Sequence, residues 1–415
     1  MSSIQDDFQS WLPNTTSNFN PTTSSSSDSP SLSSLSHELD TLSGDQSFDN
    51  IKFHSTVSSS SRKPPPFTVS SVKTDTSQIS FLAARGPILY AATTREVSLY
   101  DPRTLTLVGS LGPSSALARS IAFGRRHRIF TAHLDRKIRV WRRSTADHRR
   151  HRLVSTLPTL QDRIFRCLIP GSYVQVRRHE RRLWVEHADA VSSLAVDDSS
   201  GLVYSASWDR SFKTWDGLRC VGTVRAHVDA VNTVVVGPAG RTVYTGSADG
   251  QIRVWSAVGK RHHRLVATLE KHESSVNALT LTGDGSGFCS GGGDGLIIVW
   301  ERENEHDDED TCEFFVACWL KGHKGAVLCL AQAKGVLISG SSDRTVRVWG
   351  IRPGGYKGCL VILEGHVKPV KSLVAVPDDE EDMNLDEGLS VYSGSLDGEI
   401  RAWKISTISS LIGCD

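Results

Sequence analysis

One recurring pattern of four residues constrains the fold more than any other feature of the chain. Its clearest copy has His187 followed after 18, 22 and 28 residues by Ser205, Asp209 and Trp215. Two further copies keep these offsets: His227, Thr245, Asp249 and Trp255, then His272, Ser290, Asp294 and Trp300. Two looser copies change only the first gap: His323, Ser339, Asp343 and Trp349, then His366, Ser393, Asp397 and Trp403. A repeat of about 40 residues made of short strands predicts four-stranded blades arranged radially.

Two weaker copies precede these five. One has Tyr100 in place of the tryptophan and lacks the polar residues, with Asp75, Tyr90 and Thr94 near the positions of His, Ser/Thr and Asp. The other has Thr131, Asp135 and Trp141, with Ser114 near the position where His is expected. Each copy contains short β-branched and aromatic runs between Gly, Asp and Ser turns. The sequence therefore predicts an all-β fold of seven blades.

The first 66 residues have a different composition. They are rich in Ser, Thr and Asp and hold few side chains that could fill a core, so we expect a disordered tail over 1–66 and a propeller over 67–415. The tail is read either as a phosphorylatable segment, with Ser29-Pro30 as one candidate site, or as a solubilising leader. We expect Phe67 to Val72 to complete the last blade, with Ser406 to Ile412 as the alternative strand.

The bulk composition excludes several classes of protein. Charged residues make up 22% of the chain and the formal net charge is +1, so no global field favours nucleic acid or membrane. The eight cysteines are scattered without a Cys-x-x-Cys pair, which indicates neither a zinc site nor a disulfide framework. The sequence shows no signal peptide and no run of about 18 apolar residues. We expect a protein of the cytoplasm, the nucleus or both, not bound to membrane.

Stretches such as Ser247 to Trp255 and Gly322-His323 resemble the signature of the WD40-repeat β-propellers, although only Trp215-Asp216 carries the Trp-Asp pair. Residues 173–179, 182–191 and 268–272 are similar to plant proteins of the JINGUBANG group, which are stand-alone propellers regarded as regulatory adaptors. The resemblance implies that Trp donates to the Ser/Thr hydroxyl, which bonds His, which bonds Asp. It also implies a non-catalytic scaffold that binds other proteins, as a monomeric propeller within a complex, in plant signalling or development.

The Ser, His and Asp of each copy are also the members of a hydrolase triad. A nucleophile is used once and faces a pocket, whereas this set occurs five times, each time with a tryptophan beside the hydroxyl. We therefore predict structural tetrads and no catalytic residue, cofactor or metal. Residues 382–388 approach a calcium loop, but their glycine is one place late.

Three insertions interrupt the repeat, at about 142–180, 301–315 and 377–388. We expect the first two between the third and fourth strands of their blades and the third between the first and second strands, so that all three share the face opposite to the His and Asp turns. The first is basic and the others carry acidic runs at 305–310 and 378–382. The basic insertion, over residues 142–182, is read as a solvated loop, an import signal or protein contact, or a nucleic-acid or chromatin site. Leu160 to Ile169 is expected to form a short helix that packs on the rim.

The opposite face carries the candidate partner-binding residues. Leu134, Trp208 and Leu396 each precede a tetrad Asp, and their blades form an arc across the first blade. Exposed tryptophan among charged residues is typical of an interaction hot spot, and the charged neighbours here are Arg210, Asp189 and Asp229. A lone surface tryptophan lying flat on its own turn is the alternative. A cullin-RING substrate receptor is a second functional hypothesis, although Leu218 stands where such receptors commonly carry Arg.

Overall fold

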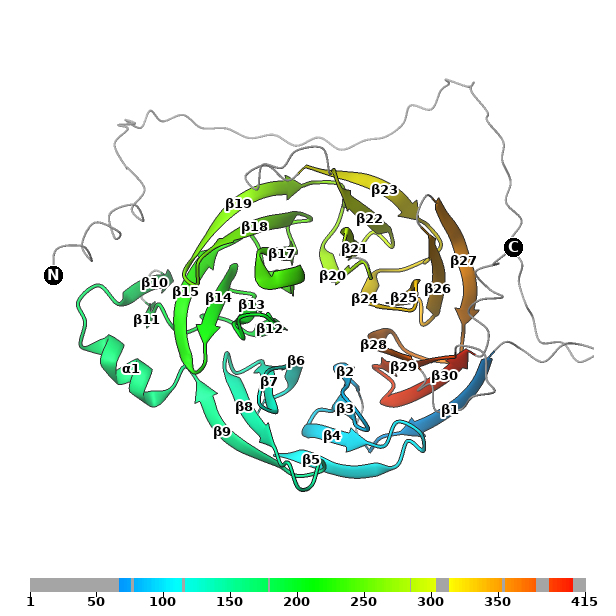
Figure 1. Ribbon diagram of the computed structural model, residues 1–415, viewed down its shortest axis with the longest axis horizontal. Helices are drawn as coiled ribbons and strands as arrows, with labels where there is room; N and C mark the ends of the chain where they lie inside the picture. Colours follow the sequence, from blue (N-terminus) through cyan, green and yellow to red (C-terminus); the bar gives the residue numbers. More distant parts are fainter. Residues whose placement is uncertain are drawn as a thin grey trace, which may run out of the picture. The chain divides into compact units, whose positions relative to one another are not determined.

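The computed structural model describes residues 67–75, 78–113, 116–177, 180–283, 285–303, 313–352, 355–377 and 388–405. These residues form a ring of seven antiparallel four-stranded sheets, each of which is one blade (Figure 1). The predicted all-β, seven-bladed propeller is confirmed. The predicted tail, its Ser29-Pro30 site, Ser114, both acidic runs and the alternative strand at 406–412 lie outside the described residues.

The strands of the seven blades follow the repeat, and one blade combines strands from both ends of the described chain. Blade 1 contains β2 (Phe81–Ala84), β3 (Leu89–Ala92), β4 (Glu96–Tyr100) and β5 (Leu107–Pro113). Blade 2 contains β6 (Ala118–Phe123), β7 (Arg128–His133), β8 (Ile138–Arg143) and β9 (His151–Leu157). Blade 3 contains β12 (Val191–Val196), β13 (Val203–Ser207), β14 (Ser211–Asp216) and β15 (Arg219–Arg225). Blade 4 contains β16 (Val231–Val236), β17 (Thr242–Ser247), β18 (Ile252–Val258) and β19 (His262–Leu269), with a 3-10 turn at Pro238–Gly240.

The remaining three blades complete the ring. Blade 5 contains β20 (Val276–Leu281), β21 (Gly287–Gly292), β22 (Ile297–Arg302) and β23 (Phe314–Leu320). Blade 6 contains β24 (Val327–Ala333), β25 (Val336–Ser341), β26 (Val346–Arg352) and β27 (Gly355–Leu363). Blade 7 contains β28 (Val370–Pro377), β29 (Leu389–Ser395), β30 (Glu399–Ile405) and β1 (Phe67–Lys73).

The ring closes through β1. This strand pairs antiparallel with β30 over seven residue pairs, from Phe67 opposite Ile405 to Lys73 opposite Glu399. The structure therefore confirms that Phe67 to Val72 forms the outer strand of the last blade. Both ends of the described chain therefore meet in blade 7, where β1 covers the outer edge of β30.

The core lies between blades. In the space between blades 2 and 3, Trp215 packs with Val140 and Leu157 of blade 2 and with Val191 and Leu194 of its own blade. The second strands bring small residues to these spaces, because their neighbours approach closely. A side chain on Gly246 of β17, for example, would come within 2.7 Å of Val276 Cγ1 of blade 5. The alternation of large and small residues thus holds the blades at close spacing.

The direction of the strands defines two faces. Neighbouring strands are antiparallel, so the turns between second and third strands and the links between blades share one face, here called the His–Asp face. The connections between first and second strands and between third and fourth strands share the opposite face. Residues 304–312 and 378–387, which lie outside the described residues, fall between β22 and β23 and between β28 and β29, which are connections of the second kind, as predicted.

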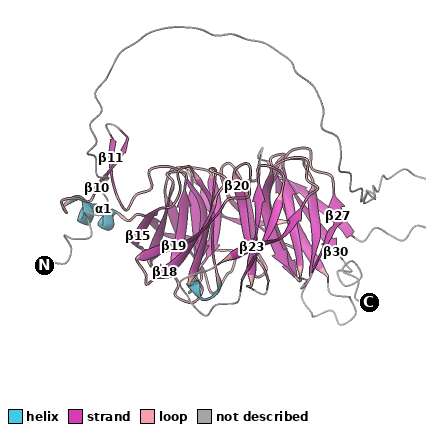
Figure 2. Ribbon diagram, turned by 90° about the horizontal axis from the view of Figure 1, so that it is seen from above, coloured by secondary structure: helices cyan, strands magenta, loops and turns pink. Residues whose placement is uncertain are grey.

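The predicted position of the first insertion is wrong for most of its length. Only Ser144 to Arg150 lies between the third and fourth strands of blade 2, because β9 begins already at His151. The helix α1 (Leu160–Cys167) and the hairpin of β10 (Tyr173–Arg177) and β11 (Glu180–Leu183) follow β9, in the link to blade 3. That link belongs to the His–Asp face, and Figure 2 shows β10 and β11 rising on the side opposite to the short helix of blade 4.

The predicted helix forms, but it packs the other way round. None of its residues is buried, and its large apolar side chains point to solvent. Its polar side chains make the contacts with the segment that leads into blade 3 and with β15: Arg163 pairs with Glu186 at 2.6 Å, Arg166 lies 4.8 Å from the ring centre of Trp184, and Asp162 accepts from the Cys220 amide at 3.4 Å. The expectation of an apolar face packed on the rim is therefore wrong.

Candidate functional site

The four residues of each complete copy meet in one chain of hydrogen bonds. In blade 3, Trp215 Nε1 donates to Ser205 Oγ at 2.9 Å. The same hydroxyl lies 2.8 Å from His187 Nε2, and His187 Nδ1 lies 2.9 Å from Asp209 Oδ2. The Ala188 amide and Ser211 also donate to the Asp209 carboxylate, so it has several donors.

The other four copies repeat this geometry. The distance from His Nδ1 to the Asp carboxylate ranges from 2.8 to 3.1 Å. The distance from His Nε2 to the hydroxyl is 2.7 or 2.8 Å, and the Trp bond is 2.8 to 3.0 Å long. The residues are His227, Thr245, Asp249, Trp255; His272, Ser290, Asp294, Trp300; His323, Ser339, Asp343, Trp349; and His366, Ser393, Asp397, Trp403.

The protonation of the blade 3 set follows from its surroundings. Burial lowers the pKa of His187, although the neighbouring Asp209 acts in the opposite direction. Burial alone would raise the pKa of Asp209, but His187 and the hydrogen bond from Ser211 bring it well below its usual range. A neutral imidazole then donates from Nδ1 to the carboxylate and accepts from the hydroxyl at Nε2, which leaves no polar atom of the set unpaired.

This arrangement is unsuited to nucleophilic catalysis. Ser205 is fully buried, and its oxygen already accepts the indole proton of Trp215 while it bonds the imidazole. A substrate carbonyl could not reach it without opening the blade. Among the described residues, His366, Asp397 and Glu399 also lie close enough to share a cation, but His366 uses both ring nitrogens within its tetrad and Glu399 bonds Arg401.

In blade 2 a histidine at a different position bonds the hydroxyl that accepts from the tryptophan. Trp141 Nε1 donates to Thr131 Oγ1 at 2.9 Å, and that oxygen bonds His133 Nε2 at 2.8 Å. His133 lies two residues after Thr131 on the same strand, and its Nδ1 bonds a backbone carbonyl at 3.0 Å. Asp135 instead pairs with Arg139 at 2.8 Å. Burial lowers the pKa of His133 to about 4.

The residues that precede the tetrad aspartates occupy one repeated position on the His–Asp face. In six blades the backbone amide of this residue donates to a carbonyl in the link before the first strand, at 2.7 to 3.1 Å. The six residues are Leu134, Trp208, Ala248, Gly293, Ser342 and Leu396. Because the turn is the same, the blades differ here mainly in the side chain that they present. Large apolar side chains occur only in blades 2, 3 and 7.

The structure places the three predicted arc residues unequally. Trp208 is 36% exposed and Leu134 is 39% exposed, whereas Leu396 is half-buried. The blades that carry them flank blade 1 on both sides (Figure 1). Asp189 and Asp229 are exposed, and each carboxylate accepts from the amide of the next residue at 2.7 Å. Arg210 is exposed as well, in a left-handed conformation with φ 74°.

The cation that contacts Trp208 is one that the sequence analysis missed. The guanidinium carbon of Arg119, on β6 of blade 2, lies 5.3 Å from the centre of the Trp208 ring. Trp208 of blade 3 and Arg119 of blade 2 therefore meet across the boundary between the two blades. Cation–π contacts of this kind contribute about 0.5–2 kcal/mol and hold the ring in a fixed orientation.

Arg119 and Lys371 occupy equivalent positions on the first strands of blades 2 and 7. Each lies at a shift of register, so its side chain is turned out of the strand pairing. Blades 3, 4 and 5 carry Ser192, Asn232 and Asn277 at this position, and these bond to a carbonyl of the next blade. Arg119 and Lys371 instead bring two cations to the arc. Burial lowers the pKa of both, and the charge of Arg119 lowers the pKa of Lys371 further.

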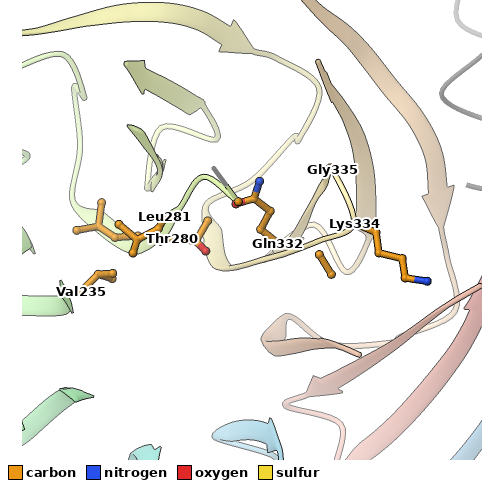
Figure 3. A pocket seen from close by; sticks show the side chains of 9 residues that line it. Val235, Thr280, Leu281, Gln332, Lys334 and Gly335 are labelled. Atoms are coloured by element: carbon orange, nitrogen blue, oxygen red, sulfur yellow. The ribbon is translucent and has the colours of Figure 1, made fainter. Parts of the chain in front are cut away.

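A cavity among the described residues lies away from the tetrads and from Trp208. It measures about 380 Å³ and opens on the opposite face between blades 4, 5 and 6. Figure 3 shows Val235, Thr280 and Leu281 on one side of it and Lys334 directed away on the other. The only strongly polar side chain near its middle is that of Gln332, so the cavity holds no grouping of acid and base.

Comparison with known protein families agrees with the tetrads. A family described as "WD domain, G-beta repeat" matches residues 179–216, 218–256, 263–301, 315–350 and 357–404. Each matched segment after the first begins at or beside the outer strand of one blade and ends at the third strand of the next. These matches and the seven-bladed ring support the placement of this chain in the WD40 repeat family. Blades 1 and 2, whose tetrads are absent or altered, are the unmatched ones.

Similarity to individual proteins is confined to short stretches. The chain is 34% identical over 100 residues to "WD repeat and FYVE domain-containing protein 1" of Mus musculus, which covers 24% of this chain and 21% of that protein. It is 33% identical over 85 residues to "DENN domain and WD repeat-containing protein SCD1" of Arabidopsis thaliana, covering 20% and 6%. It is 47% identical over 55 residues to "Cell division control protein 4" of Saccharomyces cerevisiae, covering 13% and 7%. The similarity thus spans about a fifth or less of each relative.

Proposed function

We propose that this chain is a non-catalytic adaptor that binds a segment of another protein on the His–Asp face, over blades 7, 1, 2 and 3. WD40 propeller proteins typically mediate interactions between proteins, and the tetrads leave no hydroxyl accessible for catalysis. The observation that carries the proposal is the half-exposed Trp208 held over Arg119, with Leu134 on the same turn of the neighbouring blade.

The chemistry of the face defines the partner segment. Its two partly buried cations, Arg119 and Lys371, repel one another, so a bound carboxylate or phosphate would stabilise both charges. Trp208 and Leu134 beside them favour an apolar side chain next to that acidic group. The proposed ligand is therefore an acidic peptide segment with a large apolar residue close to its anionic group.

The resemblance to the JINGUBANG group and the Arabidopsis relative support placing this adaptor in plant signalling or development, in the cytoplasm, the nucleus or both. The alternative of a ubiquitin-ligase receptor has weaker support. Leu218, which stands where such receptors commonly carry an arginine, packs against the core between blades 2 and 3. The alternative of a nucleic-acid site in the basic insertion predicts binding that is lost with rising salt.

Proximity labelling in plant cells tests the proposal with three forms of the full chain. The face variant combines Trp208→Ala, Leu134→Ala and Leu396→Ala. The matched control combines Leu107→Ala, Val258→Ala and Leu265→Ala, which removes exposed apolar side chains from β5, β18 and β19. We expect a set of proteins labelled by the wild type and the control but lost with the face variant.

A separate charge variant, Arg119→Ser, introduces the small polar residue that blade 3 carries at this position. It should weaken the same partners while the melting temperature stays close to that of the wild type. If all three folded variants label the same proteins as the wild type, the His–Asp face is not the binding site.

A further inference from the structure

The module that links blades 2 and 3, made of α1, β10 and β11, presents large apolar side chains to solvent. Its helix α1 is amphipathic, yet the contacts already described turn its polar side towards the propeller. The large apolar side chains face water: Leu160 is 73% exposed, Ile164 59%, Phe165 68% and Leu168 77%. A helix that served only to cover the rim would bury these residues, because a large apolar side chain left in water loses the favourable free energy of burial.

The adjoining residues extend the same surface. Ile169 follows the helix, and Tyr173 and Val174 begin the hairpin at 43%, 48% and 49% exposure. We call this set the apolar tip: Leu160, Ile164, Phe165, Leu168, Ile169, Tyr173 and Val174. Figures 1 and 2 show α1 and the hairpin projecting outward beyond β15 of the rim. The tip is thus a convex projection, whereas a surface that receives a peptide is concave or offers a long strand edge.

The charges in the sequence around the tip are mostly positive. Residues 142–182 contain eleven arginines and three acidic residues, in a chain whose formal net charge is +1. Two of the acidic groups are already engaged, because Asp147 pairs with Arg150 and Asp162 accepts from the Cys220 amide. Arg152 on β9, which precedes the helix, and Arg181 on β11, the second strand of the hairpin after it, are both exposed. The segment that carries the apolar tip therefore also carries an excess of positive charge.

From this combination we infer that the apolar tip inserts shallowly into the surface of a membrane that contains anionic lipids. Leu, Ile and Phe side chains would enter the boundary between headgroups and acyl chains, Tyr173 would lie at the headgroup level, and the arginines would contact anionic headgroups. The helix has only eight residues, so it would lie on the surface; among the described residues no helix is long and apolar enough to cross a membrane. Binding would be reversible, because one short helix and a basic surface supply two modest contributions.

Vesicle flotation with the purified full chain tests this inference. Two kinds of vesicle are compared, phosphatidylcholine alone and phosphatidylcholine mixed with phosphatidylserine. We expect the chain to float with the mixed vesicles and to remain in solution with the neutral ones. Phe165→Ser combined with Leu168→Ser should lower the bound fraction at least about tenfold, since both side chains would lose their apolar surroundings. Arg152→Glu combined with Arg181→Glu should lower it about tenfold at low salt.

The controls change the same residue types away from the tip. Leu107→Ser with Val258→Ser, and Arg261→Glu with Lys404→Glu, should leave vesicle binding unchanged. If the wild type ignores both kinds of vesicle, or if the tip variant binds as well as the wild type, the inference is wrong. Sedimentation without lipid tests whether the tip instead binds a second copy of the chain. That would be the conclusion if the wild type is a dimer, the tip variant is a monomer and neither binds vesicles. The Trp208 face variant should bind vesicles normally, which separates this inference from the proposed function.

Discussion

At the scale of single residues, each complete tetrad is held by a histidine that uses both ring nitrogens. In blade 3 the hydroxyl of Ser205 joins His187 to Trp215, so it is the central member of the chain of bonds. Removing it leaves an indole donor and an imidazole acceptor buried without partners. The tetrad therefore behaves as a unit, and its middle member is the most sensitive to substitution.

Ser205→Ala should lower the free energy of unfolding by about 2–4 kcal/mol, because two buried polar groups lose their partner. Urea denaturation followed by tryptophan fluorescence measures this change. Thr145→Ala, at an exposed loop position, is the control and should change stability by less than about 0.5 kcal/mol. Equal effects of the two substitutions would contradict the structural role of the hydroxyl.

A second histidine makes stability depend on pH. His263 of β19 packs edge-on against Phe212 at 5.2 Å and Tyr204 at 5.6 Å between ring centres. Both of its ring nitrogens are buried and have no hydrogen-bond partner among the described residues. Burial lowers the pKa of His263 to about 4, from an ordinary value of 6.5. The unfolded chain therefore binds a proton first as the pH falls, and folded stability is lost between pH 6.5 and 4.

His263→Phe should remove this contribution and keep the aromatic packing. We expect the variant to be more stable than the wild type by about 1–2 kcal/mol at pH 5, and the difference to shrink above pH 7. Thermal unfolding at a series of pH values measures it. A constant difference between the two proteins across this range would show that His263 does not titrate on unfolding.

The sequence predicts the tetrads well and the residues of the face less well, for a physical reason. A tetrad recurs with fixed offsets because the blade geometry is the same each time, so spacing alone identifies its members. His133 replaces a histidine that in the complete copies precedes the first strand of the blade. It is found only by noticing that it stands where those blades have Ser or Gly. Arg119 and Trp208 are 89 residues apart in numbering, and only the ring brings them together.

At the scale of elements, β1 is the strand whose removal has the clearest consequence. It covers the outer edge of β30 in blade 7, and Val72 packs against the core shared by blades 7 and 1. The alternation of apolar and polar residues from Phe67 to Val72 predicts this strand. The repeat predicts a place for it, because the described chain after Trp403 contains no fourth strand for the last blade. The local sequence pattern and the closure of the ring therefore give the same result.

Deleting residues 1–75 should lower the melting temperature by roughly 10 °C, because blade 7 loses its outer strand and the ring loses its closure. Deleting residues 1–62 keeps β1 and is the matched control, with an expected change near zero. Differential scanning calorimetry on both deletions and the full chain measures the effect. An unchanged melting temperature for the longer deletion would mean that β1 does not close the ring in solution.

The insertion after blade 2 shows where element-level prediction fails. The sequence shows where this insertion interrupts the repeat. The face of the propeller that carries the insertion depends on whether the fourth strand of blade 2, β9, comes before or after the helix. The run from His151 to Leu157 is short, basic at its start and only partly apolar, so no local pattern distinguishes it from the rest of the insertion. The expected orientation of α1 is also wrong, because apolar periodicity indicates an amphipathic helix but does not show which side contacts the protein.

At the scale of the whole molecule, the described ring combines two kinds of surface. The His–Asp face carries Trp208, Arg119 and Leu134 on rigid turns, whereas the apolar tip projects from the link beside blade 3. An adaptor needs recognition on a fixed scaffold, and seven blades joined by cores that neighbouring blades share provide it. If both proposals hold, a partner bound over blades 7 to 3 would be kept near a lipid surface. The two surfaces can be separated by mutation because they share no residue.

The pairing of β1 with β30 also determines how the ring would respond to a pulling force. Phe67 lies opposite Ile405, so a load applied through the two ends of the described chain would act on the same end of one strand pair. Such a load opens antiparallel strands pair by pair, like a zipper, and does not shear all seven pairs at once. In an optical trap the propeller should therefore open at blade 7 at low force when held by these ends. When the handles are attached within two blades other than blade 7, the force needed to open the propeller should be much higher.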